Sequence, residues 1–510
     1  MGGTSSASVE PPPIETDPLW DRIVSQNYKE ICYECSQKKQ LWQDPFFPAD
    51  DGSLYYGKDT PRGLKWMRPH DISRKRDALP QFFVKDADRF DLIQGELGNC
   101  WLVAAIGSLA DHKNLLHHVV LPNQSFDPSK GYVGVFRFRF YRFDHWVEIC
   151  VDDRLPTVNG QLIFVHSSES NEFWGALIEK AYAKMHGSYQ ALEAGIPGDA
   201  LTDLTGGIVE SYIFSRCGPR DYCPIEAPPN LDAFLMRAVQ RGSLVCAGIF
   251  GDSDGTTEVL SNGLVAGHAY TVAEIQALDL RSKIVTLLRV RNPWGNAFEW
   301  RGAWSDLSSE WDYITKEQKQ QLKYRLDSDG DFWMDLNDFV HNFSDLNICN
   351  MTPDSIEQQG LRQWDTHIIQ GRWIKGYTAG GSINSGRKLY ATNPQYEVRV
   401  VEGMLDDGRG SLVIELSQKD RRRNRSKGYR FWSIGFSLYK VESEASMPLT
   451  PSFLGAFEPI ASSEYMPVRT VTVHLWLAPG SYVLIPSTLE AHQEAEFVIR
   501  IWNEKETRLV

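Results

Sequence analysis

The hydrophobic pattern of this 510-residue chain changes near residue 354, and the change limits the folds that it can adopt. Before that point helical and strand patterns mix. The apolar spacing over 101–110 predicts a helix, and 283–291 is typical of a strand that ends at an Asn-Pro-Trp-Gly turn. After it, short alternating runs such as 471–477 lie between turns rich in Gly, Pro and Asp. The sequence therefore predicts an α+β region followed by an antiparallel β-sandwich.

The charge balance and the chain's start exclude several classes of protein. Lys and Arg total 53 against 66 Asp and Glu, which leaves a net charge of −13 and argues against a nucleic-acid binder. No apolar run approaches the roughly 18 residues that span a bilayer. Residues 1–17 are rich in Gly, Ser and Pro and predict a disordered tail without a secretory signal. Eight cysteines are too few for a disulfide scaffold, so we expect a cytoplasmic protein.

Four polar residues have the spacing and context of a thiol-based catalytic site. Cys100 opens the predicted helix at 101–110, where the unpaired N–H groups and the helix dipole favour a thiolate. Gln94 lies on the same loop and can donate its amide to a developing oxyanion. His268 follows a flexible loop and can act as general base, and Asn292 can orient its ring. Taken singly, a cysteine before a helix or a histidine in a strand is more often a core residue.

The motifs around these residues resemble those of calpains, the calcium-activated cysteine proteases. The matching strings are Q-G-E-L-G-N-C-W at 94–101, G-H-A-Y at 267–270 and R-N-P-W-G at 291–295. The resemblance implies a papain-like core of two lobes and supports Cys100 as nucleophile. It implies lobes at 18–212 and 213–352 and a calpain-type β-sandwich at 353–510. We expect an atypical or truncated member without the penta-EF-hand domain, for which a regulatory subunit is not expected.

The resemblance also implies two Ca²⁺ ions in the core, one in each lobe. The first would be held by the carboxylates of Asp91 and Glu172 and by the backbone carbonyls of Val84 and Asp86. The second would be held by the carboxylates of Glu299, Asp306, Asp329 and Asp331 and by the backbone carbonyl of Asp327. Calcium prefers six to eight hard oxygen ligands, several of them carboxylates, so the residue types are suitable.

We therefore predict a calcium-activated intracellular cysteine endopeptidase that makes limited cuts in protein substrates. The alternative is a catalytically silent scaffold that binds calcium or lipid through the sandwich. The basic run 419–427 is typical of a solvated loop, but it could also dock acidic phospholipids or pair with Asp406 and Asp407. Residues 251–261 resemble a loop that gates the cleft.

Overall fold

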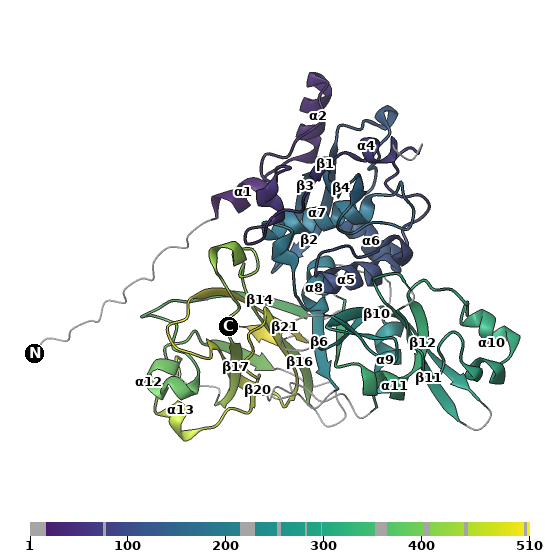
Figure 1. The fold of residues 1–510 in the computed structure, drawn as a ribbon. Coiled ribbons are helices and arrows are strands. Elements are labelled where there is room, and N and C mark those ends of the chain that lie inside the picture. Colours follow the sequence, from purple (N-terminus) through teal and green to yellow (C-terminus); the bar gives the residue numbers. More distant parts are fainter. Residues whose placement is uncertain are drawn as a thin grey trace, which may run out of the picture. The chain divides into compact units, whose positions relative to one another are not determined.

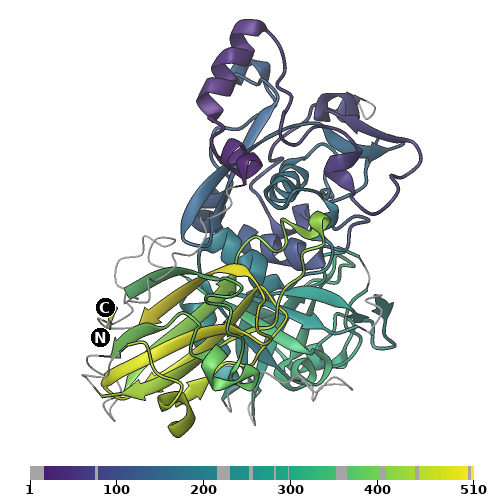
Figure 2. The same cartoon turned by 90° about the vertical axis from the view of Figure 1, so that its left-hand side faces the viewer.

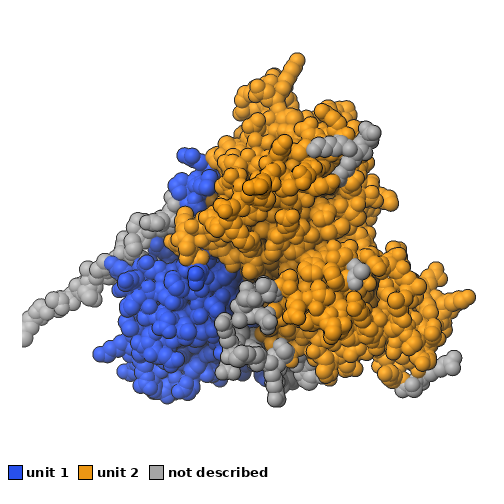
Figure 3. Space-filling model, viewed as in Figure 1, with its two compact units in different colours: residues 1–25, 362–421, 430–510 blue, residues 26–361, 422–429 orange. Residues whose placement is uncertain are grey.

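The computed structural model divides into two compact units, which Figure 3 colours separately. Unit 2 contains Gln26–Leu361 and Arg422–Tyr429, and unit 1 contains the remainder of the chain. The structure describes residues 17–74, 78–214, 230–251, 257–280, 283–296, 298–351, 365–400, 409–442, 447–503 and 507–509. Residues 1–16 of the predicted tail at 1–17 lie outside these ranges, and so does the predicted domain boundary near 353.

The first half of unit 2 is organised by two buried helices, α5 (Cys100–Ala110) and α7 (Trp174–His186). Every residue of α7 is buried, as is every residue of α5 after Cys100, which is typical of helices that are enclosed on all sides. The hairpin β2 (Val135–Arg142) and β3 (His145–Asp152) packs against α7. The other elements of this half are α2 (Tyr28–Lys38), α3 (Asp51–Leu54), β1 (Leu64–Met67), α4 (Pro69–Arg74), α6 (Lys113–Val119), β4 (Leu155–Val158), β5 (Gln161–Leu162) and α8 (Pro197–Thr205).

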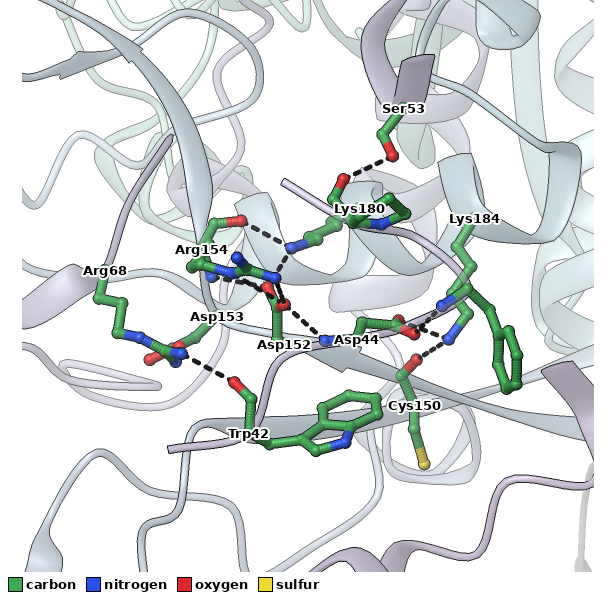
Figure 4. Close-up of polar contacts among 12 residues, drawn as sticks. Trp42, Asp44, Ser53, Arg68, Cys150, Asp152, Asp153, Arg154, Lys180 and Lys184 are labelled. Atoms are coloured by element: carbon green, nitrogen blue, oxygen red, sulfur yellow. Dashed lines mark hydrogen bonds and ion pairs between the residues drawn. The ribbon is translucent and has the colours of Figure 1, made fainter. Parts of the chain in front are cut away.

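Two lysines of α7 bury their ammonium groups in a network of ion pairs (Figure 4). Lys184 Nζ donates to Asp44 Oδ2 at 2.5 Å and to the Cys150 carbonyl at 2.6 Å. Lys180 Nζ donates to Asp152 Oδ1 at 2.6 Å. All four charged side chains are fully buried, so each charge is compensated by its partner rather than by water. The network fastens α7 to β3 and to the chain around Asp44.

The second half of unit 2 is a six-stranded antiparallel sheet. Its strands, in spatial order, are β12 (Asp331–Asp335), β11 (Ile284–Arg291), β10 (His268–Asp279), β7 (Leu244–Ile249), β13 (Asp345–Asn350) and β6 (Ile208–Ile213). Strand β6 belongs to this sheet, although the expected first lobe extends to residue 212. Helices α9 (Leu231–Gln240) and α11 (Leu336–Asn342) pack against the sheet. A hydrogen bond of 2.7 Å from Thr271 Oγ1 to the Ala104 carbonyl joins β10 to α5.

Unit 1 contains two antiparallel sheets that share one apolar core, and Figure 2 shows its strands in green to yellow. The first sheet is β14 (Asp365–Trp373), β21 (Ala495–Asn503), β16 (Gly410–Gln418) and β19 (Thr470–Leu477). The second sheet is β18 (Ala461–Ser462), β17 (Ile434–Val441), β20 (Gly480–Thr488), β15 (Tyr396–Val400) and β22 (Thr507–Leu509). Leu412 and Ile414 of the first sheet and Phe436 and Leu484 of the second all lie in this core. The predicted α+β core followed by a β-sandwich is confirmed.

The short elements outside these layers are α1 (Pro18–Val24), α10 (Lys316–Gln321), α12 (Arg387–Tyr390), α13 (Phe453–Ala456), β8 (Glu258–Val259) and β9 (Val265–Ala266). The predicted helix at 101–110 and the predicted strands at 283–291 and 471–477 are confirmed. None of the helices in the described ranges has the length and apolar character needed to traverse a lipid bilayer.

Candidate active site

Cys100 is the first residue of α5 and is presented by a loop that lies along the segment 163–166. Ile93 N–H donates to the His166 carbonyl at 2.8 Å, and Glu96 N–H donates to the Ile163 carbonyl at 2.8 Å. Gly95 allows this close approach, because a Cβ there would lie 2.4 Å from the Ile163 carbonyl oxygen. The Cys100 backbone therefore occupies the N-terminal turn of α5, where N–H groups have no partner within the helix.

His268 and Asn292 form a buried pair at the ends of neighbouring strands. His268 begins β10, and Asn292 follows β11, which pairs with β10 in antiparallel register. His268 Nε2 lies 2.9 Å from Asn292 Oδ1, which places the proton on Nε2 because the amide oxygen is an acceptor. Asn292 is itself fixed, since its Nδ2 donates to the Phe298 carbonyl at 3.0 Å. The pairing leaves Nδ1 of His268 as an acceptor, and this buried atom has no hydrogen-bond partner.

Burial holds both reactive groups in their neutral forms. It raises the pKa of the Cys100 thiol, although the backbone N–H groups of Ala269, Trp101 and Cys100 oppose the shift. Burial also lowers the pKa of His268 to about 4, against the hydrogen bond to Asn292. The thiol is thus placed against the amide of Ala269, one residue from His268, while Nδ1 of His268 stays without a partner. Both shifts favour the neutral thiol and the neutral imidazole over an ion pair in this arrangement.

Gln94 and Trp294 lie beside these groups. The Gln94 amide donates to the Leu97 carbonyl at 2.7 Å, and its Oε1 is buried without a partner. Its backbone N–H donates to the Pro293 carbonyl at 3.0 Å, which ties the nucleophile loop to the turn after Asn292. The Trp294 ring lies 4.7 Å from the His268 ring, centre to centre.

The residues predicted for the first calcium site are partly brought together. The Asp91 and Glu172 carboxyls interact with each other, and burial raises the pKa of both, that of Glu172 to about 7. Glu172 Oε1 accepts a hydrogen bond of 2.7 Å from the Val84 N–H, so the backbone N–H of Val84, rather than its carbonyl, faces Glu172. The exposed Asp86 side chain pairs with Lys113 at 2.5 Å.

Four of the five residues predicted for the second site, all but Glu299, line one small pocket. Its lining residues are Arg289, Asp306, Lys323, Arg325, Asp327, Asp329, Asp331 and Trp333. Burial raises the pKa of Glu299 to about 7, and the charges of Asp306 and Asp329 add to the shift. Burial and the charge of Asp329 raise the pKa of Asp306 to about 6. Neighbouring carboxylates thus act on Glu299 and Asp306, and their oxygens are donors that suit calcium, while Arg289, Lys323 and Arg325 also line the pocket.

Asp331 is engaged differently from its neighbours. Its carboxylate accepts from Arg89 Nη2 at 2.7 Å, from Arg289 Nε at 3.0 Å and from Arg291 Nη1 at 3.1 Å. Burial raises the pKa of Asp331, but the charges of Arg89 and Arg291 outweigh it and hold the pKa below its usual value. Arg89 precedes α5, so this ion pair joins the nucleophile's half of unit 2 to β12. Over the described ranges, no three His, Cys, Asp or Glu side chains converge on one point as they stand.

The three arginines 421–423 of the basic run 419–427 are buried rather than solvated, whereas Lys427 is exposed. Arg422 and Arg423 are buried, and their guanidinium groups donate to carbonyls of unit 2, those of Ala191 and Met185. The Arg422 guanidinium also lies over the Trp101 ring at 4.4 Å. For these arginines the expectation of a solvated position is wrong, because their guanidinium groups bond carbonyls of the protein, which no local pattern reveals. The other expected partners, Asp406 and Asp407, and the central part of the expected gating loop, 252–256, lie outside the described residues.

Comparison with known proteins gives the same class of protein as the site. Residues 42–350 match the model of the calpain family cysteine protease, and 369–502 match that of the calpain large subunit, domain III. The chain is 39% identical over 498 residues to Calpain-A of Drosophila melanogaster, covering 95% of this chain and 58% of that protein. It is 40% identical over 501 residues to the Calpain-1 catalytic subunit of Gallus gallus, covering 95% and 68%. Calpain-9 of Homo sapiens is 38% identical over 496 residues, covering 97% and 69%.

A cysteine at a helix N-terminus and a buried His–Asn pair are the residue set of a thiol protease. The chain belongs to the calpain family of cysteine proteases. It spans 58% of Calpain-A and 51% of Calpain-B of Drosophila melanogaster.

The sequence did not indicate several contacts that hold the site. Asn99 Nδ2 donates to Glu179 Oε1 at 2.7 Å from the residue before the nucleophile, and Arg89 bonds Asp331. The one available signal was a run of charged residues, Glu179 and Lys180, inside an otherwise apolar helical pattern. Charges in such a position need a buried partner, but the pattern does not say which one.

Proposed function

We propose that this protein is a calcium-activated cysteine endopeptidase that makes limited cuts in protein substrates. The observation that carries the proposal is the His268–Asn292 hydrogen bond of 2.9 Å, which leaves the buried Nδ1 of His268 without a partner. His268 is followed in the chain by Ala269, whose backbone amide contacts the Cys100 thiol. His268 Nδ1 takes the thiol proton, the sulfur attacks the substrate carbonyl, and the same imidazole returns the proton to the leaving amine. Gln94 contributes a donor to the oxyanion once its amide leaves the Leu97 carbonyl.

Calcium would be held by Asp91 and Glu172 in the first half of unit 2 and by Glu299, Asp306 and Asp329 in the second. When bound, it supplies positive charge that keeps these carboxyls ionised together. The raised pKa values of Glu172 and Glu299 support this part of the proposal. We include the Val84, Asp86 and Asp327 carbonyls and the Asp331 carboxylate as further ligands, which for Asp331 requires a rearrangement of its arginine contacts.

We propose that the protein acts in the cytoplasm, where its thiol stays reduced. The described cysteines, at positions 32, 35, 100, 150, 246 and 349, form no disulfide. Protein substrates are the partners that we propose. Arg422 and Arg423 are buried, so contact of this protein with acidic phospholipids requires a different surface.

The test is hydrolysis of a fluorogenic peptide during a calcium titration of the wild type, Cys100→Ser and Glu172→Ala. We expect turnover that rises with calcium in the wild type, none for Cys100→Ser, and a higher calcium requirement for Glu172→Ala. A folded wild type that never turns over, with saturable calcium binding, would favour the silent scaffold instead.

A further inference from the structure

Glu179 is a buried carboxyl on α7 that has no part in the proposed catalytic set of Cys100, His268 and Asn292. It is 1% exposed, and its hydrogen bonds come from two neutral donors, Asn99 Nδ2 at 2.7 Å and Val165 N–H at 3.0 Å. Its neighbour Lys180, by contrast, has a carboxylate partner. Burial raises the pKa of Glu179 to about 8 in spite of both hydrogen bonds. Burying an ionisable carboxyl is costly unless its hydrogen bonds are made, so the two donors that Glu179 holds are the contacts to explain.

Both donors belong to segments that frame the nucleophile. Asn99 directly precedes Cys100, and Val165 lies in the segment 163–166, along which the nucleophile loop runs. The Glu179 carboxyl therefore ties the start of α5 to the segment that supports Gly95 and Glu96. Asn99 is completely buried, so its amide has no water to replace this acceptor.

The Asn99 side chain fixes a peptide group rather than a helix end. It makes no capping hydrogen bond to α5, although Asn99 is the N-cap residue. The backbone of Asn99 is held by its N–H, which donates to the Leu97 carbonyl at 2.8 Å, and by its carbonyl, which accepts from Leu102 N–H at 2.9 Å. The peptide between Asn99 and Cys100 carries the Cys100 N–H, and this N–H faces the sulfur of its own residue.

The direction of that N–H matters for the chemistry. Attack by the sulfur on the substrate carbonyl carbon turns the carbonyl oxygen into an oxyanion, bonded to the carbon that the sulfur has joined. A backbone N–H that already faces the sulfur is well placed to donate to this oxyanion, and its helix position leaves it without an intrahelical acceptor. A small rotation of the 99–100 peptide would remove the donor without moving the sulfur far.

We propose that Glu179 is a positioning residue for catalysis: through Asn99 it holds the 99–100 peptide so that the Cys100 N–H binds the oxyanion. The inference rests on the proposed protease function. It predicts a defect in amide hydrolysis that is absent from a reaction of the same thiol in which no oxyanion forms.

The test compares four single variants and one double variant, each assayed in full-length protein with saturating calcium. Glu179→Met removes both acceptors at similar side-chain length, and Asn99→Ala removes the donor without removing a helix cap. Glu179→Gln is the conservative variant, because its amide can pair with a flipped Asn99 amide while its oxygen accepts from Val165. The matched control is Glu210→Gln. Glu210 is a buried carboxyl that accepts from Asn350 Nδ2 at 2.6 Å, away from the nucleophile loop.

Two rates are measured for each variant, kcat for a peptide amide and the alkylation rate of Cys100 by iodoacetamide. We expect Glu179→Met and Asn99→Ala to lower kcat about 10- to 100-fold with KM unchanged, part of the loss known for removing one oxyanion donor. Their alkylation rates should stay near the wild-type rate, and Glu179→Gln and Glu210→Gln should keep wild-type kcat. Glu179→Met and Asn99→Ala combined should lower kcat no more than either alone, since they break one contact.

The proposal is overturned if kcat and alkylation fall together, which would mean a general disturbance of the site, or if kcat does not change in folded Asn99→Ala. If Glu179→Met does not fold, as judged by circular dichroism, Asn99→Ala and Glu179→Gln decide the question. A wild type without turnover would instead refute the protease function itself, so the two failures are distinguishable.

Discussion

Calcium binding at the second predicted site should weaken as the pH falls from 7.5 to 6. Burial and neighbouring carboxylates raise the pKa of Glu299 to about 7 and that of Asp306 to about 6. The ion requires both groups to be ionised, so it competes with a proton on each. Because the folded pKa values are raised, the competition grows as the pH falls through 7.

The size of the effect follows from the two protonation equilibria. Treated as independent, they weaken the affinity about 16-fold between pH 7.5 and 6, about 8-fold from Glu299 and about 2-fold from Asp306. Two carboxyls at their ordinary pKa values would be ionised throughout this range and would give almost no dependence.

The assay is isothermal titration calorimetry with calcium at both pH values. It uses the Glu172→Ala background so that the first site does not contribute. Glu299→Gln should bind calcium more weakly, and the change in its affinity with pH should drop to about 2-fold, the contribution of Asp306 alone. Glu317→Gln, at an exposed helix start, is the control and should keep the full dependence. An affinity that does not change with pH, or a full dependence that persists in Glu299→Gln, would refute the reasoning.

Three further substitutions test separate parts of the structure. Asn292→Ala removes the hydrogen bond to His268 Nε2 and should lower kcat on the order of 10²-fold, measured with a peptide substrate, because the ring loses its orientation; full activity would show that Trp294 alone holds the ring. Gly95→Ala places a Cβ 2.4 Å from the Ile163 carbonyl oxygen, so the nucleophile loop must shift and kcat should fall. Thermal unfolding of the variant checks that it is still folded. Lys184→Met leaves the Asp44 carboxylate buried without its ammonium partner and should destabilise unit 2 by about 3–5 kcal/mol in urea unfolding. A loss below about 1 kcal/mol would mean that water reaches Asp44.

Local pattern was sufficient to predict the helix at 101–110 and the strands at 283–291 and 471–477. The choice of Cys100, His268 and Asn292 as candidate catalytic residues rested in addition on the resemblance of their motifs to those of calpains. The spacing of apolar residues at 101–110 predicts α5, and the structure buries every residue of that segment. The turn after Asn292 is likewise local: Gly295 adopts a positive φ of 59° and donates its N–H to the Asn292 carbonyl at 3.0 Å.

The contacts that decide protonation could not be predicted, since they join residues far apart in the chain. Glu179 meets Asn99 only after α7 packs beside α5, and Arg89 meets Asp331 only once both halves of unit 2 have formed. The burial of Arg422 and Arg423 within the basic run 419–427 could not be predicted for the same reason. A guanidinium group that bonds buried carbonyls has the same local sequence as one in water, and only the tertiary partner distinguishes them.

The most direct test of the central claim is the rate at which a peptide electrophile labels Cys100, with and without calcium, followed by mass spectrometry. Cys349, which is buried in β13, is the internal reference. We expect rapid labelling of Cys100 only when calcium is present, because His268 Nδ1 must then accept the thiol proton. Labelling of Cys100 at the same rate in calcium and in chelator, or no faster than that of Cys349 in either, would contradict the account.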